Sequence, residues 1–193
     1  MSNAAKWSKN VVLIDADYAD SVAFNLSVNF ERMLGRQIPK ADLADWLDCL
    51  ALDGGLRPAP QNEVQCVFLY SPEKSTLRNF QPASLTSDLD GRAFRDNLGE
   101  FLLQSVPIED VVGRKNFFLQ SIEAIGQAAE VERLLIVGDM ESFGRDIIAA
   151  ATAIEGKDIT LFAMEPLNVR GCHAELLGFS LTHALGVEGS EFV

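Results

Sequence analysis

The sequence is poor in the residues that bind zinc or build disulfide frameworks. Its 193 residues include three cysteines and two histidines. Cys49, Cys66 and Cys172 are far apart, with no Cys-x-x-Cys or Cys/His ligand spacing. Scattered thiols suit a reducing compartment, so we expect each cysteine to be a small core residue. His173 and His183, late in the chain, are more typical of ordinary surface histidines than of a general base.

Glycine-rich phosphate loops and excess positive charge are also missing. Neither GxGxxG nor GxxxxGK[ST] occurs, which argues against a nucleotide held by such a loop. The net charge of −12 argues against broad attraction to nucleic acid, which normally needs a basic face. It does not exclude a nuclease, because acidic residues around a metal ion invert the local field.

Long apolar runs are absent too. None approaches the roughly 18 residues of a transmembrane helix, and the N-terminus is polar, without the core of a signal peptide. We therefore expect a cytoplasmic protein that does not enter a membrane. Residues 1–9 are predicted to be an N-terminal tail, of which residues 1–4 resemble a cloning scar. The chain length favours one domain, over residues 10–193.

Apolar runs alternate with helical patterns along that domain, which predicts a three-layer α/β sandwich with a mainly parallel central sheet. The run at residues 10–17 is typical of a strand buried on both faces. Predicted strands cover residues 10–17, 63–71, 100–108, 133–139 and 158–164. Predicted helices cover residues 21–34, 39–53, 91–98, 117–129 and 142–154, and residues 172–185 form a helix or a helix with a short strand.

Two predicted strands end in an acid-x-acid pattern. "VVLIDADYADS" places Asp15 and Asp17 after the first strand, and "LLIVGDMESFG" places Asp139 and Glu141 after the fourth. Functional groups collect at the carboxyl ends of parallel strands, so four carboxylates could meet on one patch. Like charges at that distance are usually relieved by a proton or a cation. Oxygen ligands without histidine or cysteine favour Mg²⁺ or Mn²⁺.

The same acids have a purely local interpretation. Aspartate is common at strand ends and at helix N-caps, so Asp139 could cap the helix that follows it. The basic residues nearest to an anion site are more typical of solvated helix faces; they are Arg92, Arg95, Arg114 and Lys115.

The order of these motifs resembles the NYN domain, a branch of the PIN-like nuclease superfamily. "VLIDADY" is similar to the first acidic turn of that family, with Asp15 and Asp17 at its acid positions. "IVGDMESFGRDIIAAATAIEGKDITLFAM" is similar to its later turn and helix, with Asp139 and Glu141. The resemblance spans about residues 10–185. It implies a PIN-like fold and metal-assisted phosphodiester hydrolysis, of RNA more than DNA, and makes a homodimer plausible. The implied metal ligands are Asp15, Asp139 and Glu141, with Asp17 as the fourth catalytic residue.

Some positions depart from the family pattern. Tyr18 stands where the family has asparagine, and the helix around Lys115 lacks the usual aspartate. An inactive relative with the same fold therefore stays open.

Two further interpretations stay open. A haloacid-dehalogenase-like phosphatase would use Asp15 as nucleophile and Asp17 as general acid, with Ser71, Lys115 and Asp139 in supporting roles. A non-catalytic α/β binding module would need none of these. If the four acids crowd together, Asp139→Asn should leave the metal-free protein as stable or about 1 kcal/mol more stable.

Overall fold

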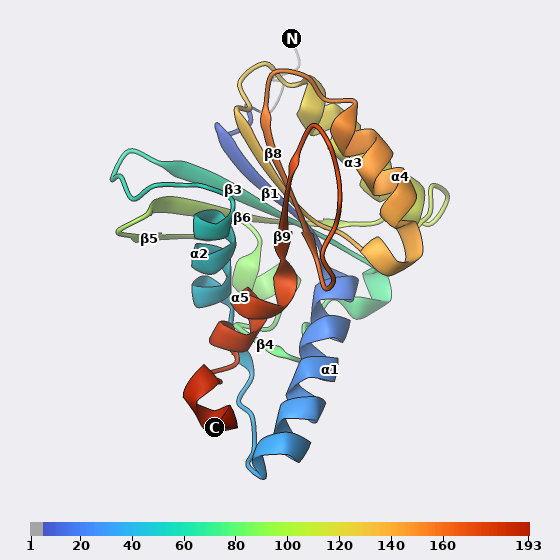
Figure 1. Cartoon of the computed structure of the whole chain (residues 1–193). Coiled ribbons are helices and arrows are strands. Elements are labelled where there is room, and N and C mark those ends of the chain that lie inside the picture. Colours follow the sequence, from blue (N-terminus) through green and yellow to red (C-terminus); the bar gives the residue numbers. More distant parts are fainter. Residues whose placement is uncertain (1–5) are drawn as a thin grey trace.

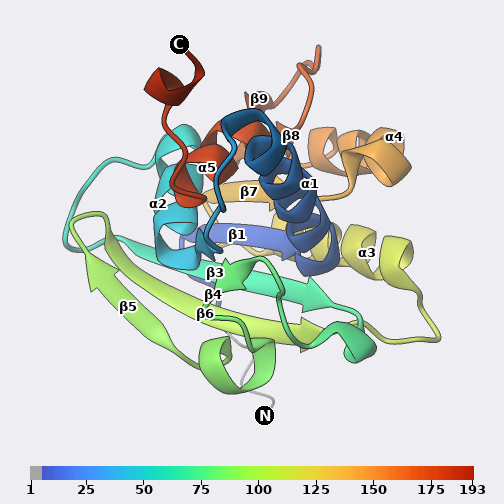
Figure 2. The same cartoon turned by 90° about the horizontal axis from the view of Figure 1, so that it is seen from below.

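The computed structural model describes residues 6–193, and its centre is a seven-stranded sheet in the order β5-β6-β3-β1-β7-β8-β9. Every neighbouring pair is parallel except β5 and β6. The strand order can be followed in Figure 2. Residues 1–5, which include the predicted cloning scar, lie outside the described residues. The strands are β1 (Asn10–Asp15), β3 (Glu63–Tyr70), β5 (Ala93–Asp96), β6 (Gly99–Pro107), β7 (Arg133–Val137), β8 (Asp158–Ala163) and β9 (His173–Leu176).

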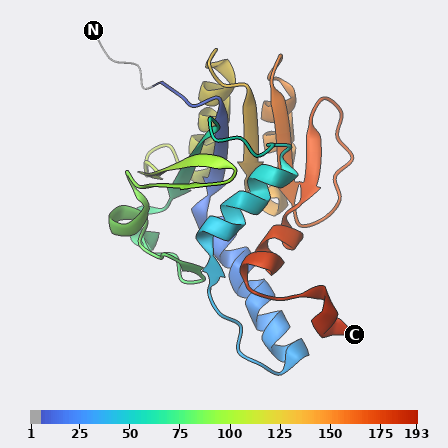
Figure 3. The same ribbon diagram turned by 90° about the vertical axis from the view of Figure 1, so that its left-hand side faces the viewer.

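Helices cover both faces of this sheet, as Figures 1 and 3 show. Alternate residues of β1 belong to different cores: Val12 and Ile14 pack with α1, α2 and α5, whereas Val11 and Leu13 pack with α3 and α4. All six residues of β1 are buried, because a central parallel strand meets helices on both sides. The helices are α1 (Ala16–Leu34), α2 (Leu43–Asp53), α3 (Arg114–Gln127), α4 (Met140–Thr152) and α5 (Leu177–Ala184). The predicted three-layer α/β sandwich is confirmed.

A second, two-stranded sheet and several short helical turns lie outside the central sheet. β2 (Ala41–Asp42) and β4 (Phe80–Gln81) form a parallel two-residue pair. Trp46 on α2 is buried against Phe80, with ring centroids 5.0 Å apart, and its indole N–H donates to Ser180 of α5 at 3.1 Å. Short helical turns complete the chain at Pro72–Lys74, Leu85–Leu89 and Gly189–Phe192. Within residues 6–193, none of the helices combines the length and apolar character needed to cross a membrane.

The helix predicted over residues 91–98 is wrong. This segment contains strand β5, which pairs antiparallel with β6 and places Phe94 opposite Phe101. The two rings stack with centroids 4.7 Å apart. The hairpin turns at Gly99, whose φ of +130° is a conformation that L side chains rarely adopt. A strand of four residues is too short for its period of two to stand out in the sequence.

Helix starts also differ from prediction. α1 begins at Ala16 rather than residue 21, and α3 begins at Arg114 rather than residue 117. The Asp15 carboxylate accepts a hydrogen bond from the Tyr18 N–H and so caps α1 directly after the strand. As a result, the acid-x-acid pair of the first motif is split, with Asp15 on the strand and Asp17 on the helix.

The order of the strands reverses direction at β1. The chain leaves β1 through α1 and α2 to reach β3 on one side, and later returns from β6 through α3 to β7 on the other side. In open parallel sheets, the carboxyl ends on either side of such a switch point flank the usual binding crevice. Here the two strands at the switch point are β1 and β7. Asp15 is the last residue of β1, and Asp139 lies two residues beyond the end of β7.

Candidate functional site

Asp15 and Asp139 end adjacent strands and cap the helices that follow. β1 pairs with β7 up to Ile14 and Val137, so the two acids leave the sheet side by side. Oδ1 of Asp15 accepts from the Tyr18 N–H at 3.1 Å, and Oδ1 of Asp139 accepts from the Ser142 N–H at 3.0 Å. The capping interpretation therefore holds for both residues. It uses one oxygen of each carboxylate and leaves the other available.

The remaining oxygens converge on one arginine. Nη2 of Arg114, the first residue of α3, lies 2.8 Å from Oδ2 of Asp15 and 3.1 Å from Oδ2 of Asp139. Nε of Arg114 is 3.4 Å from Oδ1 of Asp15. The guanidinium also lies over the ring of Phe143, with its carbon 5.3 Å from the ring centroid. Because one nitrogen contacts both carboxylates, the two acids lie within a few ångströms of each other, with a cation between them.

This ion pair is largely removed from solvent. The side chains of Asp15 and Asp139 are 2% and 10% exposed, whereas that of Arg114 is 31% exposed. Burial raises the pKa of Asp15 above its ordinary value, against the opposing charge of Arg114 and the Tyr18 N–H. Burial would lower the pKa of Arg114, but the charges and hydrogen bonds of both aspartates raise it overall. One guanidinium therefore faces two buried carboxylates and cannot neutralise both.

The other two predicted acids lie around this centre but take different partners. Asp17 accepts a hydrogen bond from the Ser71 hydroxyl and a second from the Ser71 N–H at 3.3 Å. Glu141 is exposed in the first turn of α4. Neither contacts Arg114 within hydrogen-bond or ion-pair distance in the part of the chain that the structure describes. The four acids share one edge of the sheet, but only Asp15 and Asp139 form a close pair.

Tyr18 adds a buried donor to the same edge. The residue is 6% exposed, and its hydroxyl has no hydrogen-bond partner among the described residues. Burial, and then the negative charges of Glu141, Asp139 and Asp15, raise the pKa of Tyr18 to about 12. The phenol therefore stays protonated near neutral pH. A buried hydroxyl without a hydrogen-bond partner destabilises the folded protein unless a ligand supplies that partner.

The donor set of this centre suits a hard cation. Both Oδ2 atoms point to one position, and Oδ2 of Asp15 lacks a hydrogen bond of good geometry. Among residues 6–193, no group of three or more histidine, cysteine or acidic side chains is arranged to hold a metal ion. Mg²⁺, however, is often held by one or two carboxylates together with water and phosphate oxygens. Asp15 and Asp139 fit that minimal pattern, at a position that Nη2 of Arg114 now takes.

Comparison with known proteins assigns the chain to a family. The family model described as a family of unknown function (DUF6621) matches residues 4–192. The chain belongs to DUF6621. No curated protein and no solved structure matches it.

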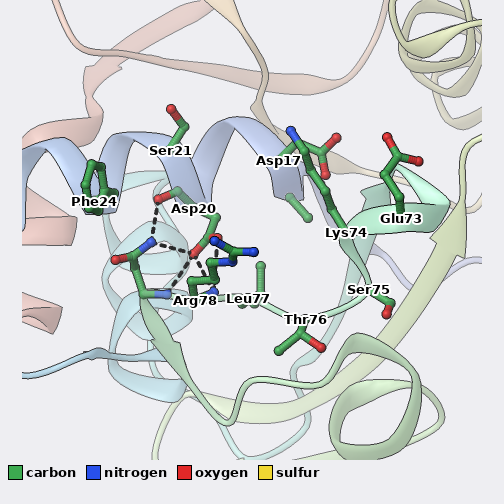
Figure 4. A pocket seen from close by; sticks show the side chains of 12 residues that line it. Asp17, Asp20, Ser21, Phe24, Glu73, Lys74, Ser75, Thr76, Leu77 and Arg78 are labelled. Carbon is green, nitrogen blue, oxygen red and sulfur yellow. Dashed lines mark hydrogen bonds between the residues drawn. The ribbon is translucent and has the colours of Figure 1, made fainter.

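A groove runs along the first turns of α1 of the DUF6621 protein, and Figure 4 shows its lining. It has a volume of about 740 Å³ and extends from Asp17 past Phe24, with the segment 73–79 as its other wall. Asp20 fixes that wall, because its carboxylate accepts from the N–H groups of Arg78 and Asn79. Phe24 is 55% exposed.

Two basic side chains line this groove, Lys74 and Arg78. Both are exposed, and neither takes part in the ion pairs found among residues 6–193. The groove of this DUF6621 member therefore carries two cations outside any ion pair and one exposed ring, together with the carboxylates of Asp17, Asp20 and Glu73.

Arg114 is the site residue that sequence reasoning placed wrongly, on a solvated helix face. Its contacts with residues 15 and 139 join positions far apart in sequence, and no local pattern marks them. Its neighbour Lys115 does behave as a surface residue, with its ammonium 2.7 Å from Asp146. The phosphatase interpretation needs that lysine near Asp15, whereas in this protein its ammonium is paired with Asp146.

Proposed function

We propose that this DUF6621 protein is a Mg²⁺- or Mn²⁺-dependent nuclease that cleaves single-stranded RNA at the carboxyl edge of β1 and β7. The proposal rests on one observation: the Oδ2 atoms of two buried aspartates at the switch point of the sheet converge on a single position, where the cationic Arg114 contacts both. The similarity of both acidic turns to the NYN pattern supports RNA as the substrate. The three free cysteines support a cytoplasmic location.

Asp15 and Asp139 would hold the metal ion, which when bound activates a water molecule and stabilises the leaving oxygen. The helix N–H groups on their Oδ1 atoms fix both carboxylates, so that each Oδ2 keeps its direction without reorganisation. Glu141, exposed nearby, would act as a further oxygen ligand. Asp17, tied to Ser71, would orient the entry to the site.

Tyr18 and the groove would bind the substrate. The Tyr18 hydroxyl is a protonated donor without an acceptor, which suits an oxygen of the scissile phosphate. Lys74 and Arg78 would contact neighbouring phosphates, and Phe24 would stack against a base, as exposed aromatic rings do in single-strand binding proteins. The path of the strand would run along α1 toward Asp15.

Cleavage of end-labelled single-stranded RNA with Mn²⁺ tests the proposal. Asp139→Asn preserves the size and the capping function of the residue but removes one ligand charge, so we expect metal-dependent cleavage to be lost. Lys115→Gln, one residue from Arg114 but outside the site, serves as the matched control and should keep full activity. Equal cleavage by wild type and Asp139→Asn would overturn the proposal.

A non-catalytic binding module is the second candidate, and one observation favours it. Arg114 supplies a cation to both aspartates without any metal, as in a purely structural ion pair. In that case the melting temperature would not respond to Mn²⁺, and Asp139→Asn would leave that absence of response unchanged.

A further inference from the structure

We propose that Arg114 is exchanged between two anionic partners, the Asp15–Asp139 pair and the phosphate of the substrate. A divalent cation would take the place of the guanidinium on the carboxylates, and the released guanidinium would bind the phosphodiester. The inference rests on the proposed function and adds a prediction to it: the metal ion and the substrate bind cooperatively.

The position of Nη2 gives the first reason. This nitrogen lies 2.8 Å and 3.1 Å from the two Oδ2 atoms that would hold a metal ion. A divalent cation and the guanidinium cannot occupy that position together, because they would overlap and repel each other. Binding of the metal therefore requires the Nη2 contacts to break.

The rest of the guanidinium gives the second reason. Nη1 of Arg114 makes no hydrogen bond within residues 6–193, and the side chain is 31% exposed. The side chain is therefore partly open to solvent, and Nη1 keeps its donors for a further partner. Guanidinium groups bind phosphate through paired N–H donors, so a phosphodiester oxygen is a suitable new partner. The guanidinium carbon also lies 5.3 Å from the centroid of the Phe143 ring, which gives the guanidinium an apolar surface to lie against.

Charge balance gives the third reason. The two carboxylates are fully neutralised by a divalent cation but only half neutralised by Arg114. With the metal in place, the arginine charge has no partner until a phosphate arrives. A phosphate that engages Arg114 in turn lowers the cost of metal entry. Thermodynamic linkage makes this coupling reciprocal, and couplings of this kind typically change affinity about 5–150-fold.

Calorimetric titration with Mn²⁺ tests the exchange, with and without a short 2′-O-methyl oligoribonucleotide that resists cleavage. For wild type, we expect the oligonucleotide to tighten Mn²⁺ binding about tenfold. Without oligonucleotide, Arg114→Gln should bind Mn²⁺ about tenfold more tightly than wild type. Adding the oligonucleotide should leave the Mn²⁺ affinity of this variant unchanged. Lys115→Gln is the control and should behave as wild type.

The outcomes separate the two proposals. If Mn²⁺ binds wild type and Arg114→Gln with equal affinity, and wild type cleaves RNA with Mn²⁺, the proposed exchange of Arg114 is wrong and the nuclease assignment stands. If Mn²⁺ binds neither protein, both are wrong. Should Arg114→Gln not fold, the Nε–H resonance of Arg114 in wild type gives the same decision. It should shift on addition of Mg²⁺, and an unchanged resonance at saturating Mg²⁺ would overturn the exchange.

Discussion

Removing the arginine from the metal-free protein should expose the cost of two buried like charges. In Arg114→Gln, Asp15 and Asp139 lose their only ion-pair partner among the described residues, while their side chains stay 2% and 10% exposed. Removing one partner of a buried ion pair typically costs about 3–5 kcal/mol. Because the Arg114 side chain is 31% exposed, we expect about 3 kcal/mol, at the lower end of that range.

The comparison needs two further variants, and urea denaturation at pH 8 without divalent ions measures all of them. Lys115→Gln removes an exposed ion pair whose two side chains are each 47% exposed, which is worth about 0–1 kcal/mol. Arg114→Gln/Asp139→Asn should recover about 1–2 kcal/mol of the loss, because one of the unpaired charges is gone. If Arg114→Gln is within 1 kcal/mol of Lys115→Gln, the ion pair does not balance the aspartates as described.

The ion pair with Arg114 also changes the stability expected for the single variant Asp139→Asn without metal. The sequence suggested that four crowded acids repel one another, so that the substitution would relieve strain. In the structure, Arg114 lies between the two closest acids, and Asp139 stabilises that arginine as well as capping α4. The capping contribution survives in asparagine, but an ion-pair contact is lost, which opposes the relief of repulsion.

Three further predictions concern other parts of the molecule. Burial and neighbouring carboxylates raise the pKa of Asp48 to about 7, so the Asp48 carboxyl group holds its proton more tightly in the folded than in the unfolded state. The free energy of unfolding should therefore fall as the pH rises from about 4 to 7. Asp48→Asn should flatten that pH dependence and raise the free energy of unfolding by roughly 1–2 kcal/mol at pH 8, as measured by urea titrations across pH. Gly99→Ala should lower stability by about 2 kcal/mol in the same assay, because its Cβ would lie 2.4 Å from the Asn62 carbonyl oxygen. Arg78→Gln should weaken RNA binding and reduce its salt dependence by about one unit of slope, whereas Arg92→Gln, an exposed control outside the groove, should bind as wild type in fluorescence anisotropy.

The sheet was predictable because its central strands are apolar on both faces. Residues 10–17 and 133–139 each contain a continuous apolar run, and the structure gives β1 and β7 within them. The ends of these two strands were placed two residues late, because Asp15 and Asp139 already cap the helices that follow. Local signals of this kind fix the existence of an element better than its ends.

The meeting of the two aspartates was predictable and their arginine was not. Both acids follow buried strands, so adjacency of the strands brings them together. Arg114 reaches them from the start of α3, where "GRKN" is polar and shows no apolar period. The helix was therefore predicted to begin at residue 117, and the arginine was assigned to solvent. Only the three-dimensional path of the chain from β6 to β7 brings it to the acids.

Anomalous diffraction from a crystal soaked in MnCl₂ would show directly whether Asp15 and Asp139 hold a metal ion. We expect a manganese peak between Oδ2 of Asp15 and Oδ2 of Asp139, at about 2.0–2.6 Å from each, with the guanidinium of Arg114 withdrawn from both. A map without a peak there at saturating Mn²⁺, and with Nη2 of Arg114 still bridging the two carboxylates, would contradict it.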